Sequence, residues 1–420
     1  FFVKSSHFKK GYYMDFKELA SKYKTPLYVY DFNYIKERYE ALKNAFYARK
    51  SLVCYAVKAN SNLSVLKFLA DLGAGFDCVS IGEVKRALMV GAKRYQIIFS
   101  GVGKSDEELK EALENEILLI NVESFAELLR LEEIAKGLNL KARISIRVNP
   151  GVDAKTHPYI STGLNENKFG VDAQTAKKMY IHAKASEFLE PTGIHFHIGS
   201  QLTSLSPIID AAKIVSELLR ELRALEIDIK FFDVGGGLGI IYNDEKEINL
   251  YDYAQGILGA LKGQDVTIVC EPGRFIVGNA GYFVASVLYE KFNGKKRFVI
   301  TDGAMNDLIR PSLYGAHHKI FVDGKDENLG TCDVVGPVCE SGDFLAKDIN
   351  LPECESGDVI VVKGAGAYGF SMSSNYNTRN RAAEVCLLDG KDRLIRRREC
   401  FEDVVAPEIE FLESADARAK

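Results

Sequence analysis

The sequence predicts an α/β protein: a parallel (β/α)8 barrel followed by a domain made mostly of β-strands. Two observations lead to this prediction. Short apolar runs alternate with amphipathic helical runs over most of the chain, and the alternation stops near Gly278. The chain also has 420 residues, so a barrel of roughly 250 residues leaves room for a second domain.

Eight short apolar runs are the predicted barrel strands. In one of them, Ala142–Val148, apolar and polar residues alternate, which places them on opposite faces of a strand. Eight units suit a closed barrel better than an open sheet, although periodicity does not report closure, and a doubly wound sheet is the alternative. The other seven runs are Val53–Ala59, Phe76–Val79, Ile97–Ser100, Leu118–Val122, Ile194–Ile198, Phe231–Val234 and Val266–Cys270. The helical segments between them are Ser64–Ala70, Glu83–Val90, Ser105–Leu113, Phe125–Ile134, Ile208–Leu225 and Tyr251–Leu261.

After about Gly278 the sequence loses its helical periodicity. Strand-like runs separated by long polar loops predict a C-terminal β domain of sandwich or barrel-like form. The early run Leu27–Tyr30 belongs either to this domain or to the start of the barrel. We therefore divide the chain into an N-terminal extension (1–24), a barrel (25–277) and a β domain (278–420). The strand-like runs of the β domain are Tyr282–Tyr289, Arg297–Thr301, Asp358–Val362 and Ala383–Leu388.

Composition excludes several classes of function. The net charge of −4 provides no basic field for nucleic acid. No apolar run approaches the ~20 residues that span a bilayer. The eight cysteines are scattered and form no C-x-x-C pair, which argues against disulfides or structural zinc. The expected protein is cytoplasmic, with reduced thiols and a small-molecule substrate.

In a β/α barrel, functional groups follow the carboxyl ends of the strands. Lys58 lies at the end of the first predicted strand, where partial desolvation would lower the pKa of its amine and make it nucleophilic. The alternative is a lysine that extends from the strand into solvent. The pair His195 and His197 has two interpretations. The absence of nearby carboxylates or cysteines argues against a metal site, whereas His197 suits stacking on a planar ring and His195 suits burial.

Later strand ends carry groups that suit an anion. Gly235, Gly236 and Gly237 let backbone N–H groups converge on a phosphate, although glycine clusters also form plain turns. A dinucleotide fingerprint is not supported, because the cluster lies late in the chain and lacks the full spacing. Glu271 and Arg274, a carboxylate and a guanidinium, directly follow the last strand, and the alternative to a functional role is an ion pair at the protein surface.

Three segments of the β domain also carry chemically active side chains. They contribute Arg310 and Tyr314 four residues apart, Cys339 beside Glu340, and Tyr368 on a Gly/Ala-rich turn. Each segment alone is weak support for a site, because loops of this composition also serve structural roles.

Together, the motifs resemble the fold-type III pyridoxal-phosphate decarboxylases of the alanine racemase-like barrel superfamily, from about Thr25 to Glu399. This resemblance implies a TIM barrel with a β domain. It is strongest to members that convert meso-2,6-diaminopimelate to L-lysine and CO2, the last step of lysine biosynthesis. The motifs are Tyr55-Ala-Val-Lys-Ala-Asn60, Phe76-Asp-Cys-Val-Ser80, His195-Phe-His-Ile-Gly-Ser200, Asp233-Val-Gly-Gly-Gly237, Glu271-Pro-Gly-Arg274, Arg310-Pro-Ser-Leu-Tyr314, Cys339-Glu-Ser341 and Gly364-Ala-Gly-Ala-Tyr368.

The resemblance implies a role for each matching residue. Lys58 matches the Schiff-base lysine, and Glu271 the acid at the pyridine nitrogen. Cys339 matches a proton donor that completes the site of the neighbouring subunit, so a homodimer is implied. His157–Gly170 resembles a mobile loop. The remaining roles are stacking for His197; cofactor binding for Ser200, Gly235, Gly236, Gly237, Gly273, Arg274 and Tyr368; and substrate binding for Arg274, Arg310, Tyr314, Glu340 and Tyr368.

Three other readings compete with this one. A decarboxylase of ornithine, arginine or carboxynorspermidine has the same fold, but Arg310, Tyr314 and Glu340 suit a second amino-acid head group. A non-catalytic homologue would be expected to lack Lys58, Cys339 or the phosphate glycines, all of which are present. A nicotinamide-linked dehydrogenase rests on the glycine cluster alone.

Overall fold

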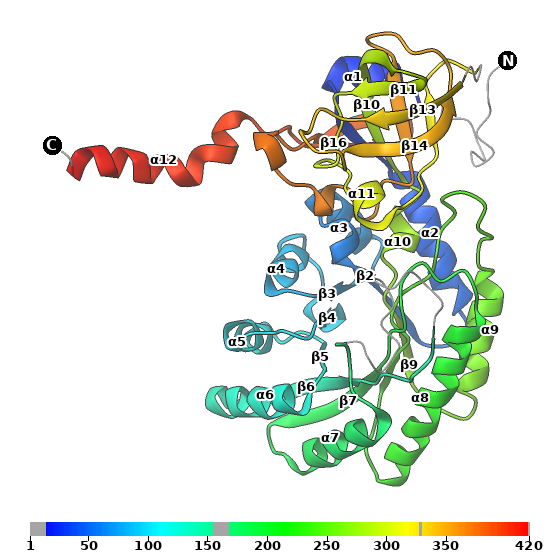
Figure 1. Cartoon of the computed structure of the whole chain (residues 1–420). Helices are drawn as coiled ribbons and strands as arrows, with labels where there is room; N and C mark the ends of the chain where they lie inside the picture. Colours follow the sequence, from blue (N-terminus) through cyan, green and yellow to red (C-terminus); the bar gives the residue numbers. More distant parts are fainter. Residues whose placement is uncertain (1–13, 154–167, 327–329, 419–420) are drawn as a thin grey trace. The chain divides into compact units, whose positions relative to one another are not determined.

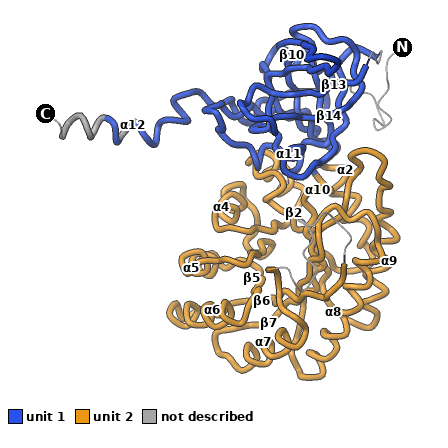
Figure 2. Tube along the Cα trace, in the orientation of Figure 1, with its two compact units in different colours: residues 1–34, 277–420 blue, residues 35–276 orange. Residues whose placement is uncertain are grey.

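The computed structural model describes residues 14–153, 168–326 and 330–418. The chain divides into two compact units, shown in Figure 2. We call Ile35–Ile276 the barrel unit. The β unit combines the two ends of the chain, Phe1–Tyr34 and Val277–Lys420.

The barrel unit is a closed barrel of eight parallel strands (Figure 1). Each strand pairs with the next along the chain, and β2 pairs with β9 to close the ring. The predicted barrel is therefore confirmed, and the doubly wound sheet is wrong. The strands are β2 (Ser51–Ala56), β3 (Gly75–Cys78), β4 (Ile97–Phe99), β5 (Leu119–Val122), β6 (Ala142–Arg147), β7 (Leu189–His195), β8 (Phe231–Asp233) and β9 (Thr267–Cys270).

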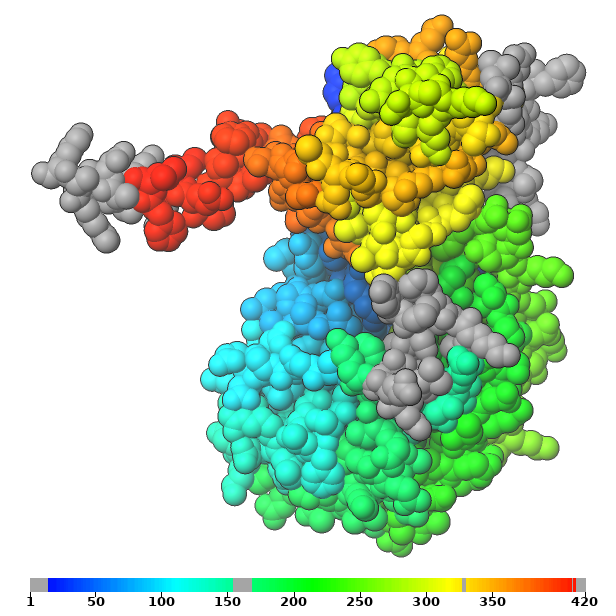
Figure 3. Space-filling view, in the orientation of Figure 1, coloured from blue at the N-terminus to red at the C-terminus, as the bar shows by residue number. Residues whose placement is uncertain are grey.

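Several helices of the barrel unit begin at a polar residue whose side chain caps the first turn. Ser105 forms a capping box with Glu108 at the start of α5, and Ser124 caps α6 by accepting from the Glu127 N–H. In Figure 3 the sequence colours of this unit pass from blue through cyan to green. The helices are α2 (Phe32–Ala45), which begins at the unit boundary, α3 (Leu63–Asp71), α4 (Ile81–Met89), α5 (Asp106–Glu114), α6 (Phe125–Leu138), α7 (Ala173–Ala185), α8 (Ser206–Ala224), α9 (Leu250–Ala260) and α10 (Arg274–Val277).

The β unit is a mainly β structure with strand order β14-β13-β11-β10-β1-β16-β17, and β15 bridges β10 and β12. Its long strand β10 changes partner along its length, pairing with β1 and β15 near its start and with β11 further on. The strands are β1 (Leu27–Asp31), β10 (Gly281–Asn293), β11 (Lys296–Thr301), β12 (Ile320–Val322), β13 (Gly330–Val335), β14 (Phe344–Leu351), β15 (Val359–Lys363), β16 (Ala383–Leu388) and β17 (Lys391–Arg396). The helices are α1 (Phe16–Tyr23), α11 (Arg310–Tyr314) and α12 (Phe401–Arg418).

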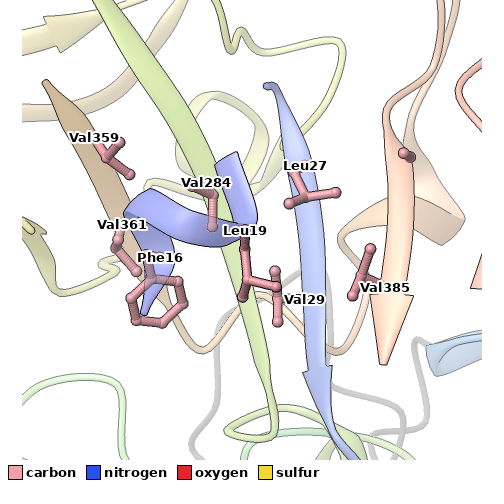
Figure 4. Packing of buried hydrophobic residues seen from close by; sticks show 9 residues of the cluster. Phe16, Leu19, Leu27, Val29, Val284, Val359, Val361 and Val385 are labelled. Atoms are coloured by element: carbon pink, nitrogen blue, oxygen red, sulfur yellow. The ribbon is translucent and has the colours of Figure 1, made fainter. Parts of the chain in front are cut away.

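The N-terminal segment is part of the β unit, which decides between the two places that the sequence left open for the run Leu27–Tyr30. Strand β1 pairs with β10 and β16, so the early strand joins the β sheet. Helix α1 packs Phe16 and Leu19 onto that sheet (Figure 4), where burial of apolar surface holds it. Their neighbours in this core are Leu27, Val29, Val284, Val359, Val361 and Val385.

Among the described residues, no helix combines the length and the apolarity that a membrane span needs.

Candidate active site

The carboxyl ends of the barrel strands bring together predicted residues that lie far apart in sequence. The Glu271 N–H donates to the Gly235 carbonyl at 2.7 Å, which ties the end of β9 to the loop after β8. Arg274 Nη2 donates to Ser200 Oγ at 3.2 Å, which ties α10 to the loop after β7. These residues therefore lie at the carboxyl end of the barrel, which is the end that carries functional groups in this fold.

Lys58 lies just beyond the end of β2, in the 3₁₀ turn Val57–Ala59. Its Nζ is 2.8 Å from Asp77 Oδ2, and its side chain is 39% exposed against 1% for Asp77. The second oxygen of Asp77 accepts from Ser100 Oγ at 2.8 Å. Burial and the charge of Glu271 raise the pKa of Asp77, and the Lys58 ammonium opposes that rise. A partly exposed amine is thus held against a buried carboxyl group, which sequence reasoning had not assigned a role.

His197 is held as a neutral ring. Its Nδ1 accepts from the Gly236 N–H at 3.1 Å, so the neutral ring carries its proton on Nε2. Burial and the positive charge of Arg147 lower the pKa of His197 well below its usual value. A neutral, fixed imidazole is suited to stack on a planar, polar ring.

The glycine loop after β8 is a tightly packed backbone cradle that leaves no room for side chains. Gly235 and Gly237 have φ angles of 65° and 97°, which favour glycine. A Cβ on Gly236 would lie 2.2 Å from the Glu271 carbonyl oxygen. Glycine is required at all three positions, because the loop passes close to the ends of neighbouring strands.

Glu271 is buried against two other polar residues. Its Oε2 lies 3.2 Å from His195 Nε2, with both side chains at most 5% exposed. One side-chain atom able to coordinate a metal, a ring nitrogen of His195 or a carboxylate oxygen of Asp233 or Glu271, comes from each residue, and the three atoms lie within 4.8 Å of one another. Burial alone would raise the pKa of Glu271, but His195, Asp233 and Lys58 lower it to about 2. The sequence has no carboxylate close to His195, but the fold brings Asp233 and Glu271 next to it, so that argument against a metal site was wrong.

Arg274 begins α10 next to Gly273, which packs tightly: a Cβ there would lie 3.0 Å from the Ala59 Cβ. The guanidinium of Arg274 contacts Ser200, as described above, and donates to Tyr242 Oη at 2.5 Å. It therefore offers charge beside a hydroxyl group, an arrangement suited to a phosphate or a carboxylate. Sequence reasoning did not identify Tyr242.

In the β unit, Arg310 and Tyr314 occupy one turn of α11 and so lie on one face of it. Arg310 is buried, and its Nη1 lies 3.1 Å from His318 Nε2. His318 Nδ1 lies 2.8 Å from the Lys363 carbonyl oxygen, which fixes the ring so that Nε2 accepts from Arg310. His318 is a supporting residue that no local pattern pointed to.

Cys339 and Glu340 lie in the exposed turn after β13. The Cys339 N–H donates to Asn377 Oδ1 at 2.9 Å. A side-chain hydrogen bond to Glu340 raises the pKa of Tyr376. The turn is thus tied to a second loop, and its thiol and carboxylate are presented outward.

Tyr368, the last predicted residue of the β unit, has a φ of 56°. It closes the turn that starts at Gly364. A φ in this left-handed region is uncommon for a residue other than glycine.

Most of the predicted loop His157–Gly170 lies outside the described residues. Its end is anchored: the Gly170 N–H donates to Glu123 Oε2 at 3.1 Å, and the Arg147 guanidinium lies 4.6 Å from the Phe169 ring centroid.

The sequence was compared with known families and proteins. The family described as "Pyridoxal-dependent decarboxylase, pyridoxal binding domain" matches residues 32–278. A diaminopimelate decarboxylase of Campylobacter jejuni is 64% identical over 402 residues, covering 96% of this chain and all of that protein. One from Helicobacter pylori (strain J99) is 57% identical over 403 residues, covering 95% and 99%.

Solved structures give the same picture. The crystal structure of Helicobacter pylori diaminopimelate decarboxylase with L-lysine has a TM-score of 0.92 at 57% identity, covering 94% of this chain and 100% of that one. The M. jannaschii diaminopimelate decarboxylase with L-lysine has a TM-score of 0.90 at 38% identity, covering 95% and 96%.

Proposed function

The chain belongs to the diaminopimelate decarboxylases within the pyridoxal-dependent decarboxylase family, and from this we propose that it converts meso-2,6-diaminopimelate to L-lysine and CO2. This is the last step of lysine biosynthesis. The observation that carries the proposal is the set of groups at one end of the barrel, Lys58, the glycine loop and Glu271, in a chain 64% identical to such an enzyme.

The barrel unit fits pyridoxal phosphate. Gly235–Gly237 form a backbone cradle free of side chains, because a Cβ at any of the three would collide with neighbouring backbone. Ser200 with Arg274 adds a hydroxyl group and a cation. We assign the phosphate to these groups, the aldehyde to the amine of Lys58, and the face of the ring to His197. When bound, the cofactor supplies an electron sink for the bond that breaks as CO2 leaves.

The protein's own residues then hold charges and protons in place. Glu271 stays anionic, consistent with its lowered pKa, and so favours a proton on the pyridine nitrogen. Asp77 receives the ammonium of Lys58 at 2.8 Å and gives that amine a defined position when it is not attached to the cofactor. The Sγ–H of Cys339 delivers the proton that replaces the lost carboxylate.

We assign recognition of the substrate to the side chains that the resemblance to the family marks. Arg274, Arg310 and Tyr314 bind carboxylates, with Tyr368 close to the cofactor and substrate. Glu340 binds the distal ammonium. Arginine suits the carboxylates because its planar group offers two parallel donors, and a carboxylate is the natural partner of an ammonium.

We also propose a homodimer in which Cys339 and Glu340 complete the site of the partner subunit. Both residues are exposed, on a turn fastened by Asn377 and Tyr376, as a group that serves another subunit must be. We further place the enzyme in the cytoplasm, where its eight free cysteines would stay reduced.

A substrate comparison tests the activity. Purified protein supplied with pyridoxal phosphate is given meso-diaminopimelate, L-ornithine or L-arginine, and CO2 and amine products are measured. We expect L-lysine from meso-diaminopimelate at the highest kcat/KM. A preference for ornithine or arginine would replace the substrate assignment, and no turnover of any of the three would overturn the decarboxylase itself.

A further inference from the structure

Behind Glu271 lies a buried group of polar side chains to which the mechanism above gives no role. Asp233 ends β8 and His195 ends β7, and both are 1% exposed. His195 Nε2 lies 3.2 Å from Glu271 Oε2. Three ionisable groups are therefore buried together, and the question is which of them carries a proton.

The hydrogen bonds around the two carboxyl groups limit where a proton can be. Asp233 Oδ1 accepts from the Gly235 N–H at 2.9 Å, and Glu271 Oε2 faces His195. The remaining oxygens, Asp233 Oδ2 and Glu271 Oε1, are buried, and neither has a hydrogen-bond partner among the described residues. One ligand atom of Asp233 and one of Glu271 lie within 4.8 Å of each other. Two buried carboxyl groups at this separation are not both ionised, so we expect them to share one proton.

The proton belongs on Asp233. His195 Nε2 lies 3.2 Å from Glu271 Oε2, a contact that favours negative charge on Glu271. Burial and the charge of Glu271 raise the pKa of Asp233 well above its usual value. A protonated Asp233 donates from Oδ2 to Glu271 while Oδ1 still accepts from Gly235. Asp233 Oδ2 and Glu271 Oε1, the two buried carboxyl oxygens without a partner, then satisfy each other.

We infer that Asp233 is a protonated positioning residue which, together with His195, holds Glu271 as the carboxylate that faces the cofactor's ring nitrogen. This inference rests on the proposed function, because only a bound pyridine ring gives the charge on Glu271 its purpose. It assigns Asp233 a donor role that an asparagine side chain would reproduce. The amide oxygen would accept from Gly235, and the amide N–H would donate to Glu271.

The test compares Asp233→Asn with Asp233→Ala in the holoenzyme. We expect Asp233→Ala to lower kcat about 10- to 100-fold, the usual effect of losing a hydrogen bond to a charged group. Asp233→Asn should lose far less. Asp77→Asn is the matched comparator. Asp77 pairs with the Lys58 ammonium, and a neutral amide does not replace its negative charge, so Asp77→Asn should lower kcat as much as Asp77→Ala.

A second readout separates positioning from general structure. Holoenzyme is prepared with cofactor labelled with ¹⁵N in the ring, and the nitrogen chemical shift is recorded. Wild type and Asp233→Asn should show a protonated ring nitrogen. In Asp233→Ala the shift should move toward the unprotonated value, because Glu271 without its donor binds a proton more tightly. Thermal unfolding of each apoprotein identifies variants that simply fail to fold.

Three results would overturn the inference. They are equal damage from asparagine and alanine, an unchanged ring-nitrogen shift in Asp233→Ala, and a stoichiometric divalent metal in wild type that is lost in Asp233→Ala. A wild-type protein that binds no cofactor or decarboxylates nothing would instead refute the proposed function, so the two failures are distinguishable.

Discussion

The Nζ atom of Lys58 lies 2.8 Å from Oδ2 of Asp77, a carboxyl group with 1% of its side chain exposed. Asp77 is in turn fixed by Ser100, and Asn121 Nδ2 donates to the same Ser100 hydroxyl at 3.0 Å. The amine thus has a defined partner in Asp77, which is held by a row of hydrogen bonds that crosses from β3 past the end of β4 to β5. This relationship leads to the first prediction.

Replacing Asp77 with alanine should slow turnover about 10- to 100-fold, because the Lys58 ammonium loses a charged hydrogen-bond partner. Steady-state kinetics with meso-diaminopimelate checks this, with cofactor content measured on the same samples. The ion pair between Lys67 and Asp71 on α3 is exposed, so Asp71→Ala is the control and should leave kcat unchanged. Full activity in Asp77→Ala would remove Asp77 from the account.

The glycine loop gives a second prediction. Gly236→Ala should weaken binding of pyridoxal phosphate and destabilise the protein by about 1–3 kcal/mol, because the new Cβ would meet the Glu271 carbonyl oxygen at 2.2 Å. Gly259→Ala on α9 is the control, since a Cβ there meets open space. It should stabilise the helix by about 0.5–1 kcal/mol. Denaturant unfolding and cofactor titration measure both effects, and unimpaired binding in Gly236→Ala would contradict the cradle.

The exposed turn of the β unit gives a third prediction. Cys339→Ala should lower kcat by about 10²- to 10⁴-fold, the usual contribution of a general acid, with a smaller effect on KM. Cys400→Ala removes the other exposed cysteine and is the control. Glu340→Gln should mainly raise KM for meso-diaminopimelate. A Cys339→Ala enzyme of normal kcat would show that the proton comes from another group.

The same turn tests the dimer. If Cys339 serves the partner subunit, inactive Lys58→Ala and Cys339→Ala chains should form mixed dimers in which one site holds both intact residues. Mixing the two variants under subunit exchange should then restore up to about a quarter of wild-type activity per site, as random assortment of two chains dictates. No recovery despite demonstrated exchange would place both residues of a site in one subunit.

Asp307 of the β unit predicts a dependence of stability on pH. Burial raises the pKa of its carboxyl group to about 7. The folded state therefore binds more protons than the unfolded state between about pH 4 and pH 7, so stability falls as pH rises through this window. Asp307→Asn should abolish this contribution, which is at most about 4 kcal/mol at about 1.4 kcal/mol per pKa unit. Urea unfolding of both proteins at pH 5, 6, 7 and 8 checks this, and parallel curves would contradict it.

The barrel could be read from the sequence because each strand and helix has its own local period. All eight predicted strands coincide with β2–β9 to within a few residues, except that β7 begins at Leu189, well before Ile194. Pro191 and Gly193 interrupt its apolar pattern, which hid its first half. The position of β1 could not be read, because its partners β10 and β16 lie far along the chain.

The site residues likewise fall into those that the sequence predicts and those that only the fold shows. Lys58, Gly235–Gly237 and Glu271 follow strands directly, so their placement at the same end of the barrel follows from topology. Supporting contacts do not: Asp233 and His195 reach Glu271 only after the barrel closes. His318 and Asn377 likewise act through tertiary contacts to Arg310 and Cys339. No period or motif within a single segment reports such contacts.

The most direct test of the central claim is to find where the cofactor is attached. The holoenzyme is reduced with borohydride, digested, and its peptides are analysed by mass spectrometry. The account predicts a single phosphopyridoxyl group on Lys58, and none on the Lys58→Ala protein treated in the same way. A modified lysine elsewhere, or no modified peptide from a fully loaded wild-type enzyme, would contradict it.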